Sequence, residues 1–133
     1  LLENDVNSHG YTSWFFFKVK SCGKGRACFH ILNLSKSPYL YKIGWKISTF
    51  SVAKYYENQT RWFKSGQNLQ TYPTNFEKKA GGGETFSCVY FEYEFEENES
   101  EVYFAMSRPY TYSMLSRAIG KMEKSIQQED PKI

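Results

Sequence analysis

The stretch Thr85-Phe-Ser-Cys-Val-Tyr-Phe-Glu-Tyr-Glu-Phe-Glu96 decides the fold class of this 133-residue chain. From Val89 onward, apolar and aromatic residues alternate with Tyr90 and then with three glutamates. Successive side chains of a β-strand point to opposite faces, so this period of two predicts a strand with one buried and one solvated face. Three glutamates at this spacing also suggest paired carboxylates for acid–base chemistry, but a solvated strand face explains them more simply.

Two further strands are predicted near the start of the chain, in residues 13–20 and 26–34. Aromatic residues occupy both faces of the first strand, so we expect it to be covered on both sides where it begins. One face carries Phe15, Phe17 and Val19, and the other carries Trp14, Phe16 and Lys18. The glycines of segment 21–25 supply a turn, which predicts that the two strands form an antiparallel hairpin.

The middle of the chain predicts shorter elements. We expect a structured loop in residues 35–45, a strand in 46–50, a brief helical turn in 51–58, and two short strands, 62–63 and 69–72, around Ser65-Gly66. Segment 77–84 is predicted to be the least ordered, because its three glycines fix a backbone poorly. After an acidic turn, residues 102–106 are predicted to complete a second hairpin with the strand 85–96.

The period changes after Pro109. Apolar residues recur there at the three-and-four spacing of an amphipathic helix, namely Leu115, Ala118, Ile119, Met122 and Ile126. Thr111 or Ser113 is the expected N-cap, and the helix either docks on the sheets or belongs to a following domain. The sequence therefore predicts an all-β fold, an antiparallel β-sandwich or squat barrel of short strands with one C-terminal amphipathic helix.

Composition and charge restrict the classes of function. The three cysteines, Cys22, Cys28 and Cys88, do not resemble the disulfide framework of a secreted protein. The chain has no long apolar run and no signal-peptide signature at its start, so we expect a cytoplasmic protein that does not enter membranes. Residues 1–70 hold ten Lys/Arg and three Asp/Glu, whereas residues 71–133 hold seven and eleven. This asymmetry either steers a charged partner or simply reflects the order of solvated faces along the chain.

Residues with catalytic chemistry are scarce. The two histidines, His9 and His30, form no zinc-ligand motif, and we expect His30 to have a structural role in its strand. Neither a nucleophile elbow nor a phosphate loop is present, so we expect no catalytic and no metal-binding residue in this chain. Aromatic and basic residues interleave at 14–20 and 61–64, as in single-strand nucleic-acid platforms. Because these aromatics alternate as core residues do, nucleic acid is not an expected partner.

Four blocks of sequence point to a known family. They are Trp14-Phe-Phe-Phe-Lys-Val19, then Phe29-x-Ile-x-Asn-Leu-x-Lys36, then Leu40-Tyr-x-x-Gly44, and finally Val102-Tyr-Phe-Ala105 followed by Pro109-Tyr-Thr-Tyr-Ser-x-Leu115. In this order they resemble the amino-terminal domain of cytosolic carboxypeptidases, in the zinc metallocarboxypeptidase superfamily. The resemblance spans about residues 14–117. It departs at Trp45-Lys-Ile47 and at Arg108, where the family usually has Met-x-Pro and an aromatic residue.

The resemblance implies a sandwich packed against an α/β catalytic domain that lies outside this chain. Residues 1–110 would form the amino-terminal sandwich, and residues 111–133 a helix leading towards that domain. Zinc and the catalytic residues would lie in the catalytic domain, so this chain would need no cofactor. In the family the whole enzyme removes C-terminal glutamates, often from polyglutamylated tubulin, and the amino-terminal domain supports folding and shapes access to the active site.

The resemblance also suggests where this chain meets its partner. The expected domain-interface residues are Arg108, Pro109, Tyr110, Thr111, Tyr112 and Ser113. A rigid strand-to-helix corner built by Pro109 and two packed tyrosines explains the same block equally well. The basic half of the chain would also present Lys and Arg side chains to acidic polyglutamylated tails. The alternative function is an independent β-sandwich adaptor that binds a protein or peptide.

Overall fold

Two antiparallel sheets face each other in the computed structural model, which describes residues 12–20, 23–35, 37–78 and 83–129. The larger sheet has the strand order β1-β7-β3-β4 and the smaller sheet has the order β2-β6-β5. The strands are β1 Phe16–Lys20, β2 Gly25–Leu34, β3 Ile47–Ser51, β4 Phe63–Ser65, β5 Gln67–Glu77, β6 Thr85–Phe95 and β7 Glu101–Ala105. The predicted antiparallel sandwich is therefore confirmed.

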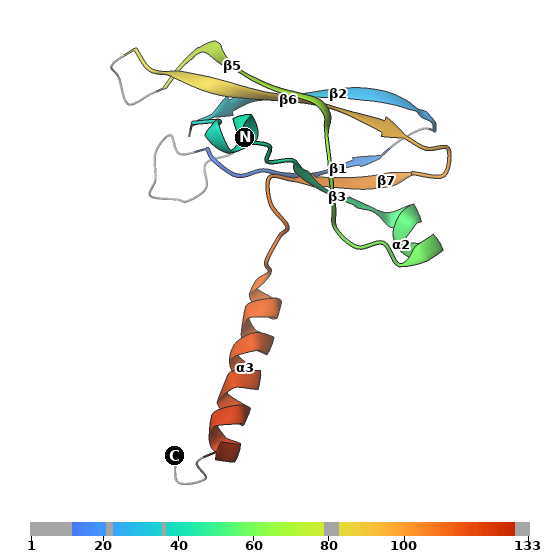
Figure 1. The fold of residues 1–133 in the computed structure, drawn as a ribbon, viewed down its shortest axis with the longest axis vertical. Coiled ribbons are helices and arrows are strands. Elements are labelled where there is room, and N and C mark those ends of the chain that lie inside the picture. Colours follow the sequence, from blue (N-terminus) through green and yellow to red (C-terminus); the bar gives the residue numbers. More distant parts are fainter. Residues whose placement is uncertain (1–11, 21–22, 36, 79–82, 130–133) are drawn as a thin grey trace.

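Helices accompany the sheets at three places in the described ranges (Figure 1). The helix α1 (Tyr39–Lys42) is a single turn within the segment for which the sequence predicts only a loop. The predicted helical turn is α2 (Val52–Asn58), where the Ser51 hydroxyl accepts a hydrogen bond from the backbone N–H of Lys54 as an N-cap. The predicted C-terminal helix is α3 (Tyr112–Glu129).

The core between the sheets is mostly aromatic. The alternating residues of β6 are buried as predicted, namely Val89, Phe91, Tyr93 and Phe95. Phe104 of β7 lies opposite them, with its ring centroid 5.6 Å from that of Phe91 and 5.0 Å from that of Phe29. Aromatic pairs at such separations each contribute about 0.5–1.5 kcal/mol beyond the burial of their area. Phe104 therefore joins the two sheets.

Both predicted hairpins are wrong. The strand β1 pairs with β7, not with β2, and β2 pairs with β6 in the other sheet. The strand β7 pairs with β1 and β3, not with β6. Each of these two connections therefore crosses from one sheet to the other. Alternation fixes which face of a strand is buried but not which strand lies beside it, so a short turn alone does not distinguish a hairpin from a crossing.

A further crossing between the sheets occurs at Gly66. This residue separates β4 of the larger sheet from β5 of the smaller sheet, and its φ of 94° is in the region that favours glycine. A Cβ atom at this position would lie 3.1 Å from Cγ1 of the buried Ile47. The two predicted short strands around Ser65-Gly66 are present, although β5 continues to Glu77.

A buried carboxylate fixes the turn between β6 and β7. Glu99 is only 1% exposed and accepts hydrogen bonds from the Tyr93 hydroxyl at 2.9 Å and from the backbone N–H of Glu96 at 3.0 Å. The ammonium of Lys54 in α2 lies 3.5 Å from the same carboxylate. Burial by itself raises the pKa of Glu99, but these donors together hold that pKa below its ordinary value.

Ion pairs join the basic and the acidic halves of the chain. Lys18 and Lys20 of β1 pair with Glu101 of β7, and Arg26 of β2 pairs with Glu92 and Glu94 of β6. Of the three glutamates in residues 85–96 predicted to be solvated, Glu92 is in fact only 9% exposed. The charge asymmetry of the sequence is thus partly neutralised within the fold.

Some predictions fall on residues that the structure does not describe. Segment 77–84 is described only at its flanks, where Lys78 and Glu84 form an ion pair at 3.0 Å. The ends of the two predicted domains, residues 1–11 and 130–133, also lie outside the described residues. The domain boundary predicted at residue 110 lies within the described residues and stays a prediction.

Candidate functional site

The outer face of the four-stranded sheet carries aromatic side chains that reach solvent. Trp14 and Phe16 are 41% and 46% exposed, so the expectation that both sides of the first strand are covered is wrong within this chain. The Phe16 ring centroid lies 6.0 Å from that of Trp14, 6.2 Å from that of Trp62 and 5.9 Å from that of Tyr103. We call this surface the aromatic face, and it consists of Trp14, Phe16, Trp45, Phe50, Trp62 and Tyr103.

The strand register explains how these residues come together. Tyr103 on β7 is paired with Lys18 on β1 and with Phe50 on β3, so the three side chains form one row across the sheet. The Lys18 ammonium lies 5.7 Å from the centroid of the Tyr103 ring, within the range of a cation–π interaction. Sequence analysis grouped Trp14, Phe16 and Lys18 on one side of residues 13–20, but the contributions of Phe50, Trp62 and Tyr103 follow only from the pairing of β1, β7 and β3.

A hollow of about 390 Å³ opens at one end of the aromatic face. We call it the basic hollow, and its lining residues are Trp45, Ser48, Trp62, Phe63, Lys64, Ser107 and Arg108. The Lys64 ammonium lies 4.5 Å from the centroid of the Trp45 ring and donates a hydrogen bond to the Ser48 hydroxyl at 3.0 Å. Burial lowers the pKa of Lys64 below its ordinary value.

Residues 106–111 form a linker from β7 to α3, and two tryptophans hold its start. The indole N–H of Trp45 donates to the carbonyl of Met106 at 2.9 Å, and that of Trp14 donates to the Ser107 hydroxyl at 3.2 Å. Trp14 and Trp45 therefore set the direction in which the chain leaves the sandwich. The sequence contained no signal for this role, because the three segments involved are distant along the chain.

The six predicted interface residues lie together in this linker and in the first turn of α3. Arg108 is exposed and lines the basic hollow, and Pro109 is half-buried. Tyr110 and Tyr112 are 62% and 82% exposed, which contradicts the alternative explanation of a corner built on two packed tyrosines. Thr111 rather than Ser113 caps α3, since its hydroxyl accepts a hydrogen bond from the N–H of Met114 at 3.3 Å.

The apolar stripe of α3 has no neighbour among the described residues. Figure 1 shows α3 extending away from the layer formed by β1, β7 and β3, and residues such as Ile119 and Met122 are 46% and 64% exposed. Of the two placements that the sequence allows, docking on the sheets is therefore not observed. The aromatic face, the linker and the α3 stripe leave one side of the molecule with uncovered apolar surface.

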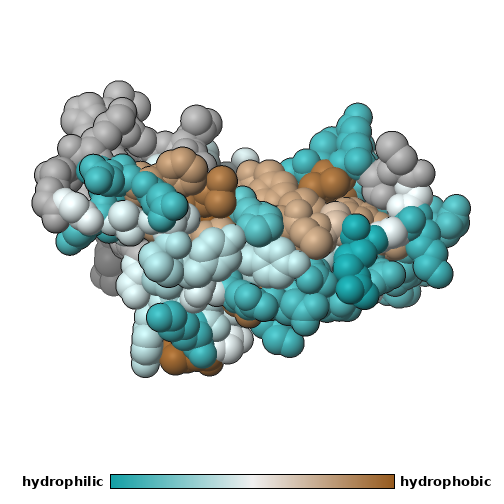
Figure 2. All heavy atoms as spheres, turned by 90° about the horizontal axis from the view of Figure 1, so that it is seen from above, coloured by the Kyte–Doolittle hydropathy of each residue, from teal (hydrophilic) through white to brown (hydrophobic). Residues whose placement is uncertain are grey.

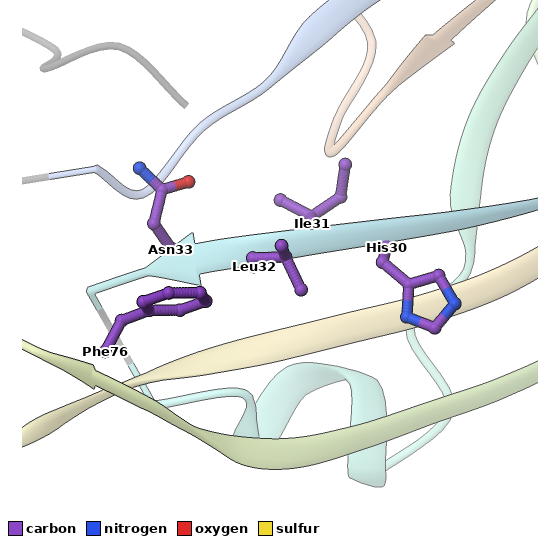
Figure 3. A pocket seen from close by; sticks show the side chains of 5 residues that line it. All are labelled: His30, Ile31, Leu32, Asn33 and Phe76. Atoms are coloured by element: carbon purple, nitrogen blue, oxygen red, sulfur yellow. The ribbon is translucent and has the colours of Figure 1, made fainter.

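Polar side chains cover much of the outer face of the three-stranded sheet, and hydrophobic areas interrupt them (Figure 2). Here Nδ1 of His30 is 2.7 Å from the Tyr72 hydroxyl, in agreement with the structural role predicted for His30. Next to His30 is an open hollow of about 420 Å³, in which Figure 3 shows Leu32 and Phe76 beside each other. Phe76 is 56% exposed, similar to Phe16 on the aromatic face.

Known relatives cover nearly the whole chain. Cytosolic carboxypeptidase 1 of Danio rerio is 31% identical over 128 residues, which are 92% of this chain and 11% of the relative. By homology, the chain resembles a segment of the cytosolic carboxypeptidases. Cytosolic carboxypeptidase 1 of Homo sapiens is 30% identical over 131 residues, and cytosolic carboxypeptidase 2 of Homo sapiens is 29% identical over 115 residues. These matches cover 94% and 86% of this chain but 11% and 12% of the relatives. No protein-family profile matches the chain.

The resemblance to cytosolic carboxypeptidases carried by the four sequence blocks is thus confirmed, and the chain spans 11% of the length of the first relatives that it matches. Within the described residues, no group of three or more His, Cys, Asp and Glu side chains is placed to hold a metal ion. No described helix is long and apolar enough to cross a membrane. Cys28 and Cys88 are free thiols, one exposed and one buried, and Cys22 lies outside the described residues.

Proposed function

We propose that this chain is a non-catalytic domain of a cytosolic zinc carboxypeptidase and that it supports the catalytic domain of the same polypeptide. The observation that carries the proposal is the exposed aromatic face, which adjoins the linker held by Trp14 and Trp45. Soluble proteins rarely leave large contiguous apolar patches uncovered, and tryptophan and tyrosine often dominate the binding energy of interfaces. The catalytic domain is the proposed cover of the aromatic face, and it would also contact residues 108–113 in the linker and the first turn of α3.

The activity of the whole enzyme is part of the same proposal. The matched relatives are named cytosolic carboxypeptidases and are about nine times as long as this segment. Zinc and its ligands would lie in the region outside the segment, and the enzyme would remove C-terminal glutamates from polypeptides such as tubulin in the cytoplasm. Zinc content and glutamate release from a polyglutamylated peptide are the measurements. Both are expected in the full-length protein, and neither in this chain alone.

The supporting role is tested with matched variants of the aromatic face. Phe16→Ala in the full-length protein is expected to lower the melting temperature and the glutamate release, because it removes a ring from the proposed interface. Phe76→Ala is the control, since it removes a similarly exposed ring from the opposite sheet. Equal effects of the two variants in the full-length protein would contradict the proposed interface.

A second candidate role is direct contact with acidic substrate tails. It is favoured by the cations that form no ion pair with a described residue, among them Lys46, Lys64 and Arg108. Binding of a polyglutamate peptide to this chain should then weaken as the salt concentration rises. Absence of binding at low ionic strength would remove this role and leave the supporting role intact.

The independent adaptor is the remaining alternative, and the apolar hollow beside His30 is the feature that favours it. The coding sequence that follows Ile133 distinguishes the carboxypeptidase domain from the adaptor. A downstream His-x-x-Glu motif supports the carboxypeptidase domain. A stop codon, or a module without zinc ligands, supports the adaptor.

A further inference from the structure

Among the described residues, the basic hollow holds two cationic side chains and no acidic one. Its cations are Lys64 and Arg108, and none of its lining residues is Asp or Glu. In the described part of the chain neither cation forms an ion pair, whereas Lys18, Arg26 and Lys54 each lie within 4.0 Å of a carboxylate. The hollow is therefore a place where the fold concentrates positive charge without neutralising it.

Hydrogen-bond donors also exceed acceptors in the basic hollow. The Lys64 ammonium has three N–H donors and uses two of them, on the Ser48 hydroxyl at 3.0 Å and on the Lys46 carbonyl at 3.3 Å. The Arg108 guanidinium adds five donors in a planar fork, a geometry that fits a carboxylate. Trp45, Trp62 and Phe63 form apolar walls beside these donors.

The position of the basic hollow indicates which part of the polypeptide would supply an acceptor for Lys64 and Arg108. Ser107 and Arg108 line the hollow and also form the start of the linker to α3. The linker and α3 tether any polypeptide that follows α3 to the sandwich, which raises its effective concentration at the hollow above that of a free partner. The matched relatives are long enough to supply a large domain at this place, since this chain corresponds to 11% of their length.

We propose that a glutamate or aspartate side chain of the catalytic domain enters the basic hollow and pairs with Arg108 and Lys64. This inference rests on the proposed function, because the hollow adjoins the surface assigned there to the catalytic domain. The aromatic face supplies apolar contact area, and the carboxylate fixes the position of one domain relative to the other. A carboxylate in the hollow also favours the charged form of Lys64, which burial alone disfavours.

The carboxylate preference is tested on this chain with a capped Gly-Glu-Gly peptide. The indole N–H signals of Trp45 and Trp62 in an NMR spectrum report on the walls of the hollow. We expect the glutamate peptide to shift both signals, with the isosteric Gly-Gln-Gly peptide as the neutral comparison. Arg108→Gln and Lys64→Gln should weaken binding about threefold each, the effect of a partly exposed ion pair. Lys24→Gln removes the same charge from the turn before β2 and should leave binding unchanged.

Equal shifts with the glutamate and glutamine peptides would overturn the carboxylate preference. A stronger response to inorganic phosphate than to the glutamate peptide would also overturn it, because the hollow would then prefer a phosphate. The source of the carboxylate requires the full-length protein. There, Arg108→Gln should lower the melting temperature and speed proteolysis of the linker 106–111, while the same substitution leaves the melting temperature of this chain unchanged.

Comparing Phe16→Ala with Arg108→Gln in the full-length protein distinguishes failure of the interdomain carboxylate from failure of the proposed interface. If Phe16→Ala destabilises the full-length protein and Arg108→Gln does not, the interface stands and the interdomain carboxylate is rejected. If neither substitution has an effect, the interface itself fails. If Arg108→Gln leaves linker proteolysis unchanged but abolishes polyglutamate binding by the full-length protein, the hollow binds the substrate tail and the interdomain pairing is overturned.

Discussion

At the scale of a single residue, the Glu99 carboxylate connects β6, the turn after it and α2. Its oxygens accept hydrogen bonds from the Tyr93 hydroxyl and from the backbone N–H of Glu96, and the Lys54 ammonium lies beside them. We predict that Glu99→Gln lowers the unfolding free energy by about 1–3 kcal/mol, since the amide replaces one acceptor by a donor and removes the charge. Urea unfolding measures the change. The control is Glu97→Gln, an exposed position in the same turn, for which we expect less than about 0.5 kcal/mol.

The lowered pKa of Glu99 gives this contribution a defined pH dependence. Because the pKa in the folded state lies below the ordinary value of 4.5, the stabilisation is complete above pH 4.5 and is lost as the pH falls through the folded-state pKa. The difference in unfolding free energy between wild type and Glu99→Gln should therefore shrink on acidification. A difference that stays constant through the acid range would show that the ionised carboxylate is not the stabilising species.

At the scale of elements, the crossing from β4 to β5 depends on a glycine. Gly66→Ala places a side chain at a φ of 94° and 3.1 Å from Ile47 Cγ1, so we predict a loss of about 1–3 kcal/mol in unfolding free energy. The matched substitution is Gly25→Ala, where a Cβ meets no atom within 4 Å. Chemical denaturation of the two variants compares them, and equal losses would contradict the strain assigned to Gly66.

The helix α3 is expected to be independent of the sandwich in this chain. Because its apolar residues contact neither sheet, removing residues 112–133 should leave the unfolding free energy of the sandwich unchanged within about 0.5 kcal/mol. Near-ultraviolet circular dichroism follows the core aromatics during thermal unfolding. A clear fall in stability on truncation would mean that α3 packs on the sheets in solution.

Sequence patterns predicted elements better than they predicted the pairing of those elements. The alternation in residues 85–96 identified β6 and its buried face, and the spacing after Pro109 identified α3. Pairing failed at both short turns, because residues in a two-sheet fold alternate identically whether a turn stays in one sheet or crosses between sheets. The motif around Pro109 drew attention to the linker. The tryptophans that hold the linker were not recognised, because their partners are 61 and 93 residues away in sequence.

At the scale of the whole molecule, the uneven charge of the sequence has two consequences. Ion pairs between the halves, such as Lys18–Glu101 and Arg26–Glu94, neutralise charge along the sheets, and each exposed pair contributes at most about 1 kcal/mol. Lys64 and Arg108 remain beside the aromatic face. Charge and apolar surface therefore coincide on the side from which α3 leaves, and this is the side that we propose the catalytic domain covers.

Hydroxyl-radical footprinting of aromatic side chains, compared between the full-length protein and the isolated chain, measures whether the catalytic domain covers the aromatic face. The account predicts that Trp14, Phe16 and Trp62 are modified readily in the isolated chain and are strongly protected in the full-length protein, while Tyr72 and Phe76 on the opposite sheet react equally in both. Equal reactivity of Trp14, Phe16 and Trp62 in the two proteins would contradict the account, because the aromatic face would then be exposed in the whole enzyme.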